Sequence, residues 1–552
     1  MSQNSPKNLI IKWTPMVVLS FALLIIILDT TILNVSLRAI IDDLHTNIQS
    51  IQWVITAYSL VLAAFTITGG RLGDLFGRKR MFMLGAGVFA LGSFITSIST
   101  SVGMMIMGEA IVEGFGAALM MPATASLLVS NYHGRDRQIG FGIWGGIAAA
   151  GAALGPVFGG FLTTYYSWRW AFRINLVVAA VVILGSIFIK EARDTAEKPE
   201  LDFLGIVLSS LGMFLVVFGV IESSTYGWIF AKQAFAIGPI SFAFLGSASI
   251  VAPAIALGLI TLGLFALWQR RRERHRKTPL VSLALFKNNV FVRGASIVAI
   301  LALGQAGVSF ALPVFFQSSL GLSAVATGIA MLPMSLTLLV VSIGSAYVGK
   351  FITPKRLIQA GLVIDGLGLW VLSAGIGLDN GAWALVPGFV LFGIGMGLIM
   401  SQASNLTLSA VSVKQAGEAS GVNGTLRQLG SSLGSAILGA ILLGSLSSNL
   451  AAGIAGSSTI PDAAKPGIEQ AVAAQSSAIE FGSAASVANV PGIQPDVAGA
   501  VSTIAKESSA RASRSTLLYG IIFVAIGFLL SLRLPNRMSV AAEPALATSA
   551  GH

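Results

Sequence analysis

Fourteen long apolar runs, separated by charged, proline and glycine residues, are the feature that most limits how this 552-residue chain can fold. A helix needs about 20 apolar residues to cross the roughly 30 Å core of a bilayer. Charged residues make up only 10% of the chain, against about 25% in soluble domains. The sequence therefore predicts an all-α integral membrane protein and excludes a soluble enzyme or a disordered chain. The runs begin near Pro15, Ile51, Met81, Val102, Gln138, Phe172, Phe203, Val251, Phe291, Leu322, Leu357, Trp383, Gly417 and Thr516.

The positive charges indicate how these spans are oriented. With both termini in the cytoplasm, 25 of the 34 Lys and Arg residues fall in cytoplasmic segments, as the positive-inside rule requires. The basic cluster Arg270–Lys277 then marks an inner loop beside lipid headgroups, and it does not indicate a nucleic-acid site. We expect a multi-pass protein of the cell membrane whose partner is the lipid bilayer.

A glycine-rich basic motif lies between the second and third spans, Gly70-Arg-Leu-Gly73-Asp74-Leu-Phe-Gly77-Arg78-Lys79-Arg80. Charge bias accounts for its basic residues but not for the glycine spacing, which permits a tight turn and a close approach of helices. The motif resembles the signature loop of the major facilitator superfamily. That resemblance implies a gating loop formed by Gly70, Gly73, Asp74, Gly77, Arg78 and Lys79.

Four further segments look like the fourteen-span drug:proton antiporter family: Leu28–Val35, Gln52–Tyr58, Trp168–Phe172 and Gly417–Gly430. The resemblance implies proton-coupled export of hydrophobic, often cationic, drugs or toxic compounds by alternating access. Protons and a small hydrophobic substrate are the implied partners, and the proton gradient is the implied energy source. We therefore expect no cofactor, no metal and no catalytic site, in a monomer that other export components could accompany.

The same resemblance implies a major facilitator fold with two six-helix halves plus two inserted helices. A degenerate copy of the signature loop, Gly349–Arg356, follows the tenth span and fits an internal duplication. Within the second half, an Ala-, Ser- and Gly-rich external loop is expected, with helix near Ala463–Ala474 and Asp496–Ala510. The expected parts are an N-terminal half (1–190), an insert with a cytoplasmic loop (191–285), a C-terminal half (286–533) with its external loop (447–514), and a disordered tail (534–552).

The fifth span carries a face of small residues, Gly151, Gly155, Gly159 and Gly160, together with Pro156. Such a face lets two helices approach closely, and a proline kinks its helix. Ordinary membrane packing explains this pattern as well. In the family it resembles the antiporter motif, which is taken to seal the interface between halves and to distinguish exporters from uptake symporters.

Acidic residues within spans are costly in a membrane and indicate function by default. Asp29 and Glu109 each lie about 10 Å from the outer face by helical rise, and Glu113 follows Glu109 by one turn. Like charges at this spacing repel, which favours proton binding. We hypothesise that the three carboxyls carry the proton and attract cationic substrate; the alternative is a structural carboxyl in a polar pocket. The family normally has Arg where Glu109 stands and often Gln where Glu113 stands, so its coupling mechanism does not transfer directly.

Other polar residues in the spans are weaker candidates. We expect Asp365 to be structural, and for Arg427 a structural and a functional role are equally open. Uncharged groups that could bond a substrate in the cavity also bond between helices. These cavity candidates are Thr30, Asn34, Gln305, Gln402 and Asn405.

Other functional classes find little support in the sequence. The closest match to a phosphate loop, Gly344–Phe351, has Phe where Ser or Thr would hold magnesium. The four histidines are scattered in loops and the tail, and there is no cysteine. Two alternatives to drug export stay open: export of a lipid-like or fatty-acid-like cargo, and a non-transporting membrane sensor with the same fold.

Overall fold

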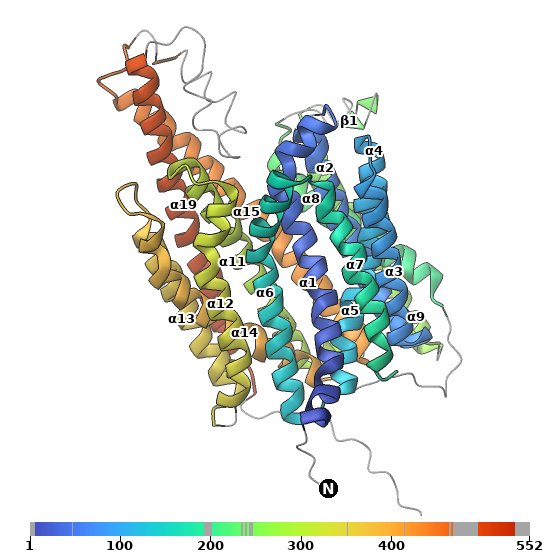
Figure 1. Cartoon of the computed structure of the whole chain (residues 1–552). Helices are drawn as coiled ribbons and strands as arrows, with labels where there is room; N and C mark the ends of the chain where they lie inside the picture. The colour runs from blue at the N-terminus through green and yellow to red at the C-terminus, as the bar shows by residue number, and fades with distance from the viewer. Residues whose placement is uncertain are drawn as a thin grey trace, which may run out of the picture.

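The computed structural model describes residues 6–46, 48–191, 201–232, 236–237, 240–241, 247–275, 277–349, 351–412, 415–462, 465–466 and 495–535. Within these residues the chain forms a bundle of long helices arranged as two groups side by side (Figure 1). The first group consists of α1 (Pro6–Asp43), α2 (Ile48–Phe76), α3 (Arg78–Ser97), α4 (Val102–Met105), the π-helix η1 (Ile106–Glu113), α5 (Gly114–Asn131), α6 (Gly134–Tyr165), α7 (Arg169–Gly185) and the short η2 (Ser186–Phe188).

The second group follows two inserted helices, of which the first packs on both groups and the second packs on the first. The insert holds α8 (Phe203–Tyr226), β1 (Ala236–Ile237), β2 (Ile240–Ser241), α9 (Val251–Arg274) and α10 (Ala284–Lys287). The second group itself holds α11 (Asn289–Val314), the π-helix η4 (Phe315–Ser319), α12 (Ala324–Val348), α13 (Pro354–Gly375), η5 (Ala382–Leu385), α14 (Val386–Ser409), α15 (Ala416–Gly456) and α19 (Pro495–Ser531).

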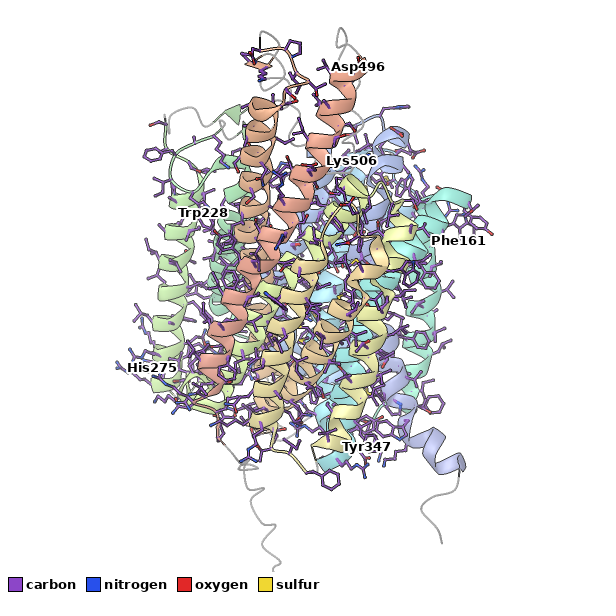
Figure 2. All side chains as sticks on the ribbon, turned by 90° about the vertical axis from the view of Figure 1, so that its left-hand side faces the viewer. Phe161, Trp228, His275, Tyr347, Asp496 and Lys506 are labelled. Carbon is purple, nitrogen blue, oxygen red and sulfur yellow. The ribbon has the colours of Figure 1, made fainter. Side chains whose placement is uncertain are left out.

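The helices agree with the predicted spans. Thirteen described helices are long and apolar enough to cross a membrane. The span predicted from Gln138 corresponds to α6, which has 32 residues. Large apolar side chains such as Phe161 and Trp228 are exposed on the outside of the bundle, where lipid would cover them (Figure 2). The chain is a multi-pass, all-α membrane protein, and its one described sheet is the two-stranded β1–β2 pair.

The start of α1 and the end of α19 lie at the same end of the bundle (Figure 1). We call it the basic end, because Lys12, Arg78, Arg272 and Lys355 gather there. Lys355 donates to the Leu532 carbonyl near the end of α19, at 2.8 Å. Lys12 pairs with Asp136 at the start of α6, at 2.7 Å. An even number of crossings, as the sequence predicts, returns the chain to this end.

The two halves meet along two pairs of helices. The N-terminal half contributes α2 and α6, which pack against α15 and α12 of the other half. Polar contacts between the halves are found at the basic end, where Arg137 donates to the Leu408 carbonyl at 2.9 Å. Arg135 also lies over the Tyr347 ring, 4.7 Å from its centroid. The described contacts therefore close the bundle at the basic end.

The stretch predicted as the external loop 447–514 is partly helical. The 41-residue α15 continues to Gly456, and the 37-residue α19 begins at Pro495. Both helices exceed what one bilayer crossing needs, so they extend beyond it as an antiparallel pair (Figure 1). Apolar side chains such as Leu450 and Val501 are buried there, which explains why helix is stable outside the membrane. Most of the helix expected near Ala463–Ala474 and the tail from 536 onward lie outside the described residues.

Candidate functional site

Three carboxyl groups from two separate segments come together inside the N-terminal half. Asp29 lies on α1, and Glu109 and Glu113 lie on η1. One oxygen from each lies within 4.8 Å of the others. Their side chains are almost completely buried, with 3%, 1% and 0% exposure. η1 is a π-helix, which is wound more widely than an α-helix and often occurs at functional sites. Both of its glutamates lie near Asp29.

A buried amide links these acids. Asn175 of α7 donates from Nδ2 to Asp29 Oδ1 at 2.9 Å and to Glu113 Oε1 at 3.3 Å. Ser93 of α3 donates to the same Glu113 oxygen at 2.6 Å and accepts from Asn175 at 3.1 Å. Four segments, α1, α3, η1 and α7, thus hold one hydrogen-bonded acid cluster.

Within the part of the chain that the structure describes, the acid cluster has no compensating positive charge. None of its three carboxyls forms an ion pair with another described residue, and one oxygen of each, together with the buried Tyr58 hydroxyl, has no hydrogen-bond partner. Three negative charges this close in a buried site would repel strongly. The cluster therefore cannot be fully ionised unless it binds a cation. Oxygen ligands of this kind suit a proton and also a hard metal cation.

The sequence indicates the three acids but not the polar groups around them. Asn175, Ser93 and Tyr58 were absent from the expected site. Asn175 carried a usable signal, because an amide inside an apolar span must find a partner. Ser93 carried none, because serine hydroxyls in spans commonly bond to their own helix.

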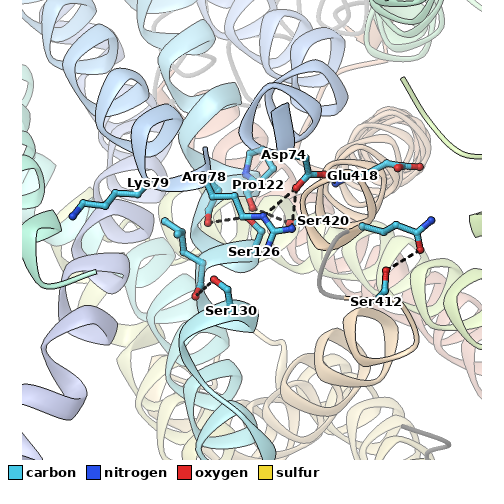
Figure 3. Close-up of polar contacts among 12 residues, drawn as sticks. Asp74, Arg78, Lys79, Pro122, Ser126, Ser130, Ser412, Glu418 and Ser420 are labelled. Carbon is cyan, nitrogen blue, oxygen red and sulfur yellow. Dashed lines mark hydrogen bonds and ion pairs between the residues drawn. The ribbon is translucent and has the colours of Figure 1, made fainter. Parts of the chain in front are cut away.

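A second polar site lies at the basic end, between the halves. Asp74, near the end of α2, accepts from Arg78 Nε at 3.0 Å and from Arg78 Nη2 at 2.9 Å through one oxygen. Its other oxygen accepts from the Glu418 backbone N–H at 2.9 Å (Figure 3). That N–H lies in the first turn of α15, where an unsatisfied donor and the helix dipole both favour an anion. Asp74 thus connects the two halves.

At two positions of the signature loop, glycine is required for different structural reasons. Gly77 has φ +106°, which disfavours any side chain, and it forms the turn before α3. Gly70 lies within α2, where an added Cβ would come 2.5 Å from the Gly417 carbonyl oxygen of α15. The predicted tight turn is therefore at Gly77, and the predicted close approach of helices is at Gly70, since α2 runs through Gly70 and Gly73. Lys79 is tied to Glu191 through its backbone N–H at 3.1 Å.

Comparison with known proteins agrees with this arrangement. The family profile described as Major Facilitator Superfamily matches residues 19–252 and 230–435. The chain belongs to the major facilitator superfamily. Two solved transporters share its fold: the human organic anion transporter MFSD10 (TETRAN) has a TM-score of 0.54 at 11% identity, covering 93% of this chain and 99% of that one. The proton:xylose symporter XylE has a TM-score of 0.53 at 11% identity, covering 77% and 87%.

Similar sequences include several exporters. The probable actinorhodin transporter of Streptomyces coelicolor is 30% identical over 80% of this chain and 74% of its own. The tetracenomycin C resistance and export protein of Streptomyces glaucescens is 29% identical, over 78% and 76%. The multidrug efflux pump LfrA of Mycolicibacterium smegmatis is also 29% identical, over 79% and 82%.

In this transporter the glycine face of α6 contacts its own half more than the other. Gly151, Gly155 and Gly159 face Ile27, Thr31 and Ile32 of α1, and Gly160 faces Val325 of α12. Spacing by four residues explains this, because it places the first three glycines on one face of the helix. The predicted close approach of helices is present, chiefly between α6 and α1. The Pro156 side chain is not among those that the structure describes.

The uncharged cavity candidates of the transporter differ in their surroundings. Gln402 donates to the Ser345 hydroxyl at 3.2 Å, so it joins α14 to α12. Asn405 accepts from Ser409 of its own helix at 3.2 Å. Thr30 donates to its own helix at the Ile27 carbonyl, at 2.9 Å. Gln305 is half-buried on α11, and the Asn34 side chain is not among those that the structure describes.

The remaining two charged candidates lie apart from the acid cluster. Asp365 is buried on α13 against Gly395 of α14, and its Oδ1 has no hydrogen-bond partner. Arg427 of α15 faces the N-terminal half, where its guanidinium lies 6.0 Å from the centroid of the Trp144 ring. The structure thus brings Asp29, Glu109 and Glu113 together and leaves Asp365 and Arg427 elsewhere.

Proposed function

We propose that this chain is a proton-coupled exporter of hydrophobic drugs or toxic compounds that works by alternating access. The acid cluster of Asp29, Glu109 and Glu113, whose oxygens lie within 4.8 Å of one another, carries this proposal. A buried group of three carboxyls with no counter-charge among the described residues favours binding of protons, and opening it to water on either side would change how many it holds. The proton is the driving ion in this proposal.

In the proposed mechanism, Asp74 controls opening and closing at the basic end. Its bonds to Arg78 and to the start of α15 stabilise the state that is closed at the basic end. Breaking them opens that end and admits substrate. Proton release from the acid cluster and separation at Asp74 then alternate during the cycle, so that inward proton flow drives outward transport.

Direction and location complete the proposal. The named exporters and resistance proteins among the relatives support export, and the predicted positive-inside orientation supports a cell-membrane protein with both termini in the cytoplasm. A hydrophobic cargo suits a site inside an apolar bundle. The cationic character that the family resemblance implies stays a prediction. We propose a monomer, since one chain holds both halves.

Transport in proteoliposomes tests the proton-coupling role. The protein would be reconstituted with an imposed pH gradient and a fluorescent hydrophobic dye such as ethidium. Asp29→Asn, Glu109→Gln and Glu113→Gln are each expected to slow gradient-driven dye transport by at least about tenfold, since each removes one proton-binding group. Asp365→Asn is the matched control, because it neutralises an equally buried carboxyl outside the acid cluster.

Two results would overturn the proposal. Gradient-driven transport that survives in all three cluster variants and in the Glu109→Gln/Glu113→Gln double variant would exclude the acid cluster from coupling. Transport by the wild type that follows a Na⁺ or Ca²⁺ gradient and ignores the pH gradient would replace the proton by a metal cation.

A further inference from the structure

A small polar pocket lies between the halves, separate from the acid cluster. It is bounded by α2, α5 and α6 on one side and by α14 and α15 on the other. Arg427 lies 11 residues after Ala416, about 16 Å along α15 and thus near the middle of a bilayer core of about 30 Å. Transporters of repeated architecture bind substrate at this depth, at the interface between repeats. Its polar lining residues are Thr66, Ser404, Ser420, Asn423 and Arg427.

The charge of Arg427 is not balanced by any acid in the described part of the chain. No Asp or Glu lines the pocket, and Arg427 forms no ion pair with a described residue. Its described neighbours are the Met121 sulfur, 3.6 Å from Nη2, and the Trp144 ring. Sulfur is a weak acceptor, so most of the guanidinium donors are available. An arginine at this depth is costly unless it has an anionic partner.

A second polar group points to the same conclusion. Asn423 lies four residues before Arg427 and therefore on the same face of α15. Its side chain is 9% exposed, lines the pocket, and has an Oδ1 without a hydrogen-bond partner. A buried amide without a partner is uncommon in proteins. The free Oδ1 shows that this end of the amide is open to a ligand, and rotation of the amide by half a turn brings its NH₂ group there. The NH₂ group and the guanidinium then offer the donors that a carboxylate or phosphate group needs.

The pocket has a volume of about 20 Å³, room for roughly one water molecule. This small size fits its position just inside the contacts that close the basic end, since Ser420, which lines it, also donates to the Pro122 carbonyl across the halves at 3.1 Å. Separation of the halves at that end would widen the pocket and expose Arg427. The one charged group that lines the widened pocket is then a cation, Arg427.

We propose that this transporter recognises an anionic amphiphile, a compound with a carboxylate or similar acidic group on a large apolar body, through Arg427 and Asn423. This deepens the proposed export function and rests on it, and an anionic cargo would replace the cationic one that the family resemblance implies. Arg427 binds the acidic group, Trp144 and Met121 contact the apolar body, and the acid cluster stays inside the N-terminal half. Separation of the two sites keeps the cargo's negative charge away from the carboxyls that hold protons.

Binding to the full-length protein in phosphatidylcholine nanodiscs tests this proposal without any gradient. Three fluorescent probes share one eleven-carbon chain with a dansyl group and differ only at the other end: a carboxylate, its methyl ester and a trimethylammonium. Wild type is expected to bind the carboxylate at least about tenfold more tightly than the ester. Arg427→Gln should abolish that preference while ester binding persists, and Arg427→Lys should retain part of it.

Arg356→Gln, at an exposed position of the basic end, is the control for a general loss of positive charge, and it should leave the preference unchanged. The proposal is overturned if the wild type binds the ester or the ammonium probe as tightly as the carboxylate. It is also overturned if the preference for the carboxylate survives in Arg427→Gln. Where Arg427→Gln does not fold, the wild-type preference and Asn423→Leu, expected to weaken carboxylate binding alone, decide the question. Failure of proton coupling in the acid-cluster variants would leave this binding result intact.

Discussion

At the residue scale, the function of this chain depends on a few polar groups whose partners come from distant helices. Asn175 and Ser93 are neutral, yet their hydrogen bonds hold the carboxyl groups of Asp29 and Glu113 in place. A hydrogen bond to a charged group contributes about 1.5–3 kcal/mol, roughly twice a neutral one. Small side chains next to the acid cluster should therefore affect transport as strongly as some of the acids.

Two serines on α3, one turn apart, test this expectation. Ser93 donates to Glu113, whereas Ser97 donates to the Phe94 carbonyl of its own helix at 2.8 Å. Ser93→Ala is expected to slow gradient-driven transport by about tenfold, because Glu113 loses a charge-assisted bond. Ser97→Ala removes an equally buried hydroxyl and should stay within about twofold of wild type. Equal transport rates for the two variants would show that the bond to Glu113 does not matter for coupling.

At the scale of elements, helix ends and glycine contacts decide how the halves meet. The end of α2 packs so closely on the start of α15 that Gly70 and Gly417 leave no room for a side chain. Asp74 then reaches the first turn of α15, while Arg78 lies buried beside it with 3% exposure. The bond from the Glu418 N–H to Asp74 is the one that crosses between the halves, and the Asp74–Arg78 ion pair holds the carboxylate in place for it.

Asp74→Ala should shift the transporter toward the state open at the basic end. Removing one member of a buried ion pair costs about 3–5 kcal/mol, and opening to water relieves that cost for Arg78. The chain has no cysteine, so spin labels at Arg135→Cys and Arg356→Cys report one distance across the halves. We expect a longer distance to gain at least about tenfold in population.

Asp136→Ala serves as the control for Asp74→Ala. Asp136 pairs with Lys12 within the N-terminal half, and both side chains are more than one third exposed. Exposed pairs contribute about 0–1 kcal/mol, so the distance distribution should not change. An unchanged distribution in Asp74→Ala as well would mean that other contacts keep the basic end closed.

At the scale of the whole molecule, two similar halves with an inserted helix pair form one transporter. One apolar cluster lies within the C-terminal half, and a second holds the N-terminal half together with a few residues of α11, α14 and α15, so that the contact between the halves involves only some of their helices. Such an arrangement permits the halves to move as rigid bodies about a site between them. The α15–α19 pair extends beyond the bilayer at the end opposite the basic end (Figure 1).

The orientation of the whole molecule can be tested in intact cells. Ser458→Cys lies beyond α15, opposite the basic end, and Arg274→Cys lies at the basic end; both positions are exposed. A membrane-impermeant maleimide is expected to label Ser458→Cys in intact cells and Arg274→Cys only after permeabilisation. The reverse pattern would invert the proposed orientation and, with it, the direction of transport.

The sequence by itself determined the membrane class, the fourteen spans and the depth of the charged residues, because hydropathy and charge act locally along the chain. It placed Asp29 and Glu109 at one depth with Glu113 one turn away, and the structure brings one oxygen of each within 4.8 Å of the others. Only the tertiary structure decided that Asn175 and Ser93 join these acids, that Gly70 faces α15, and that Arg427 has no acidic partner among the described residues. Those facts depend on which helix faces pack together, and packing joins residues that lie far apart in the sequence.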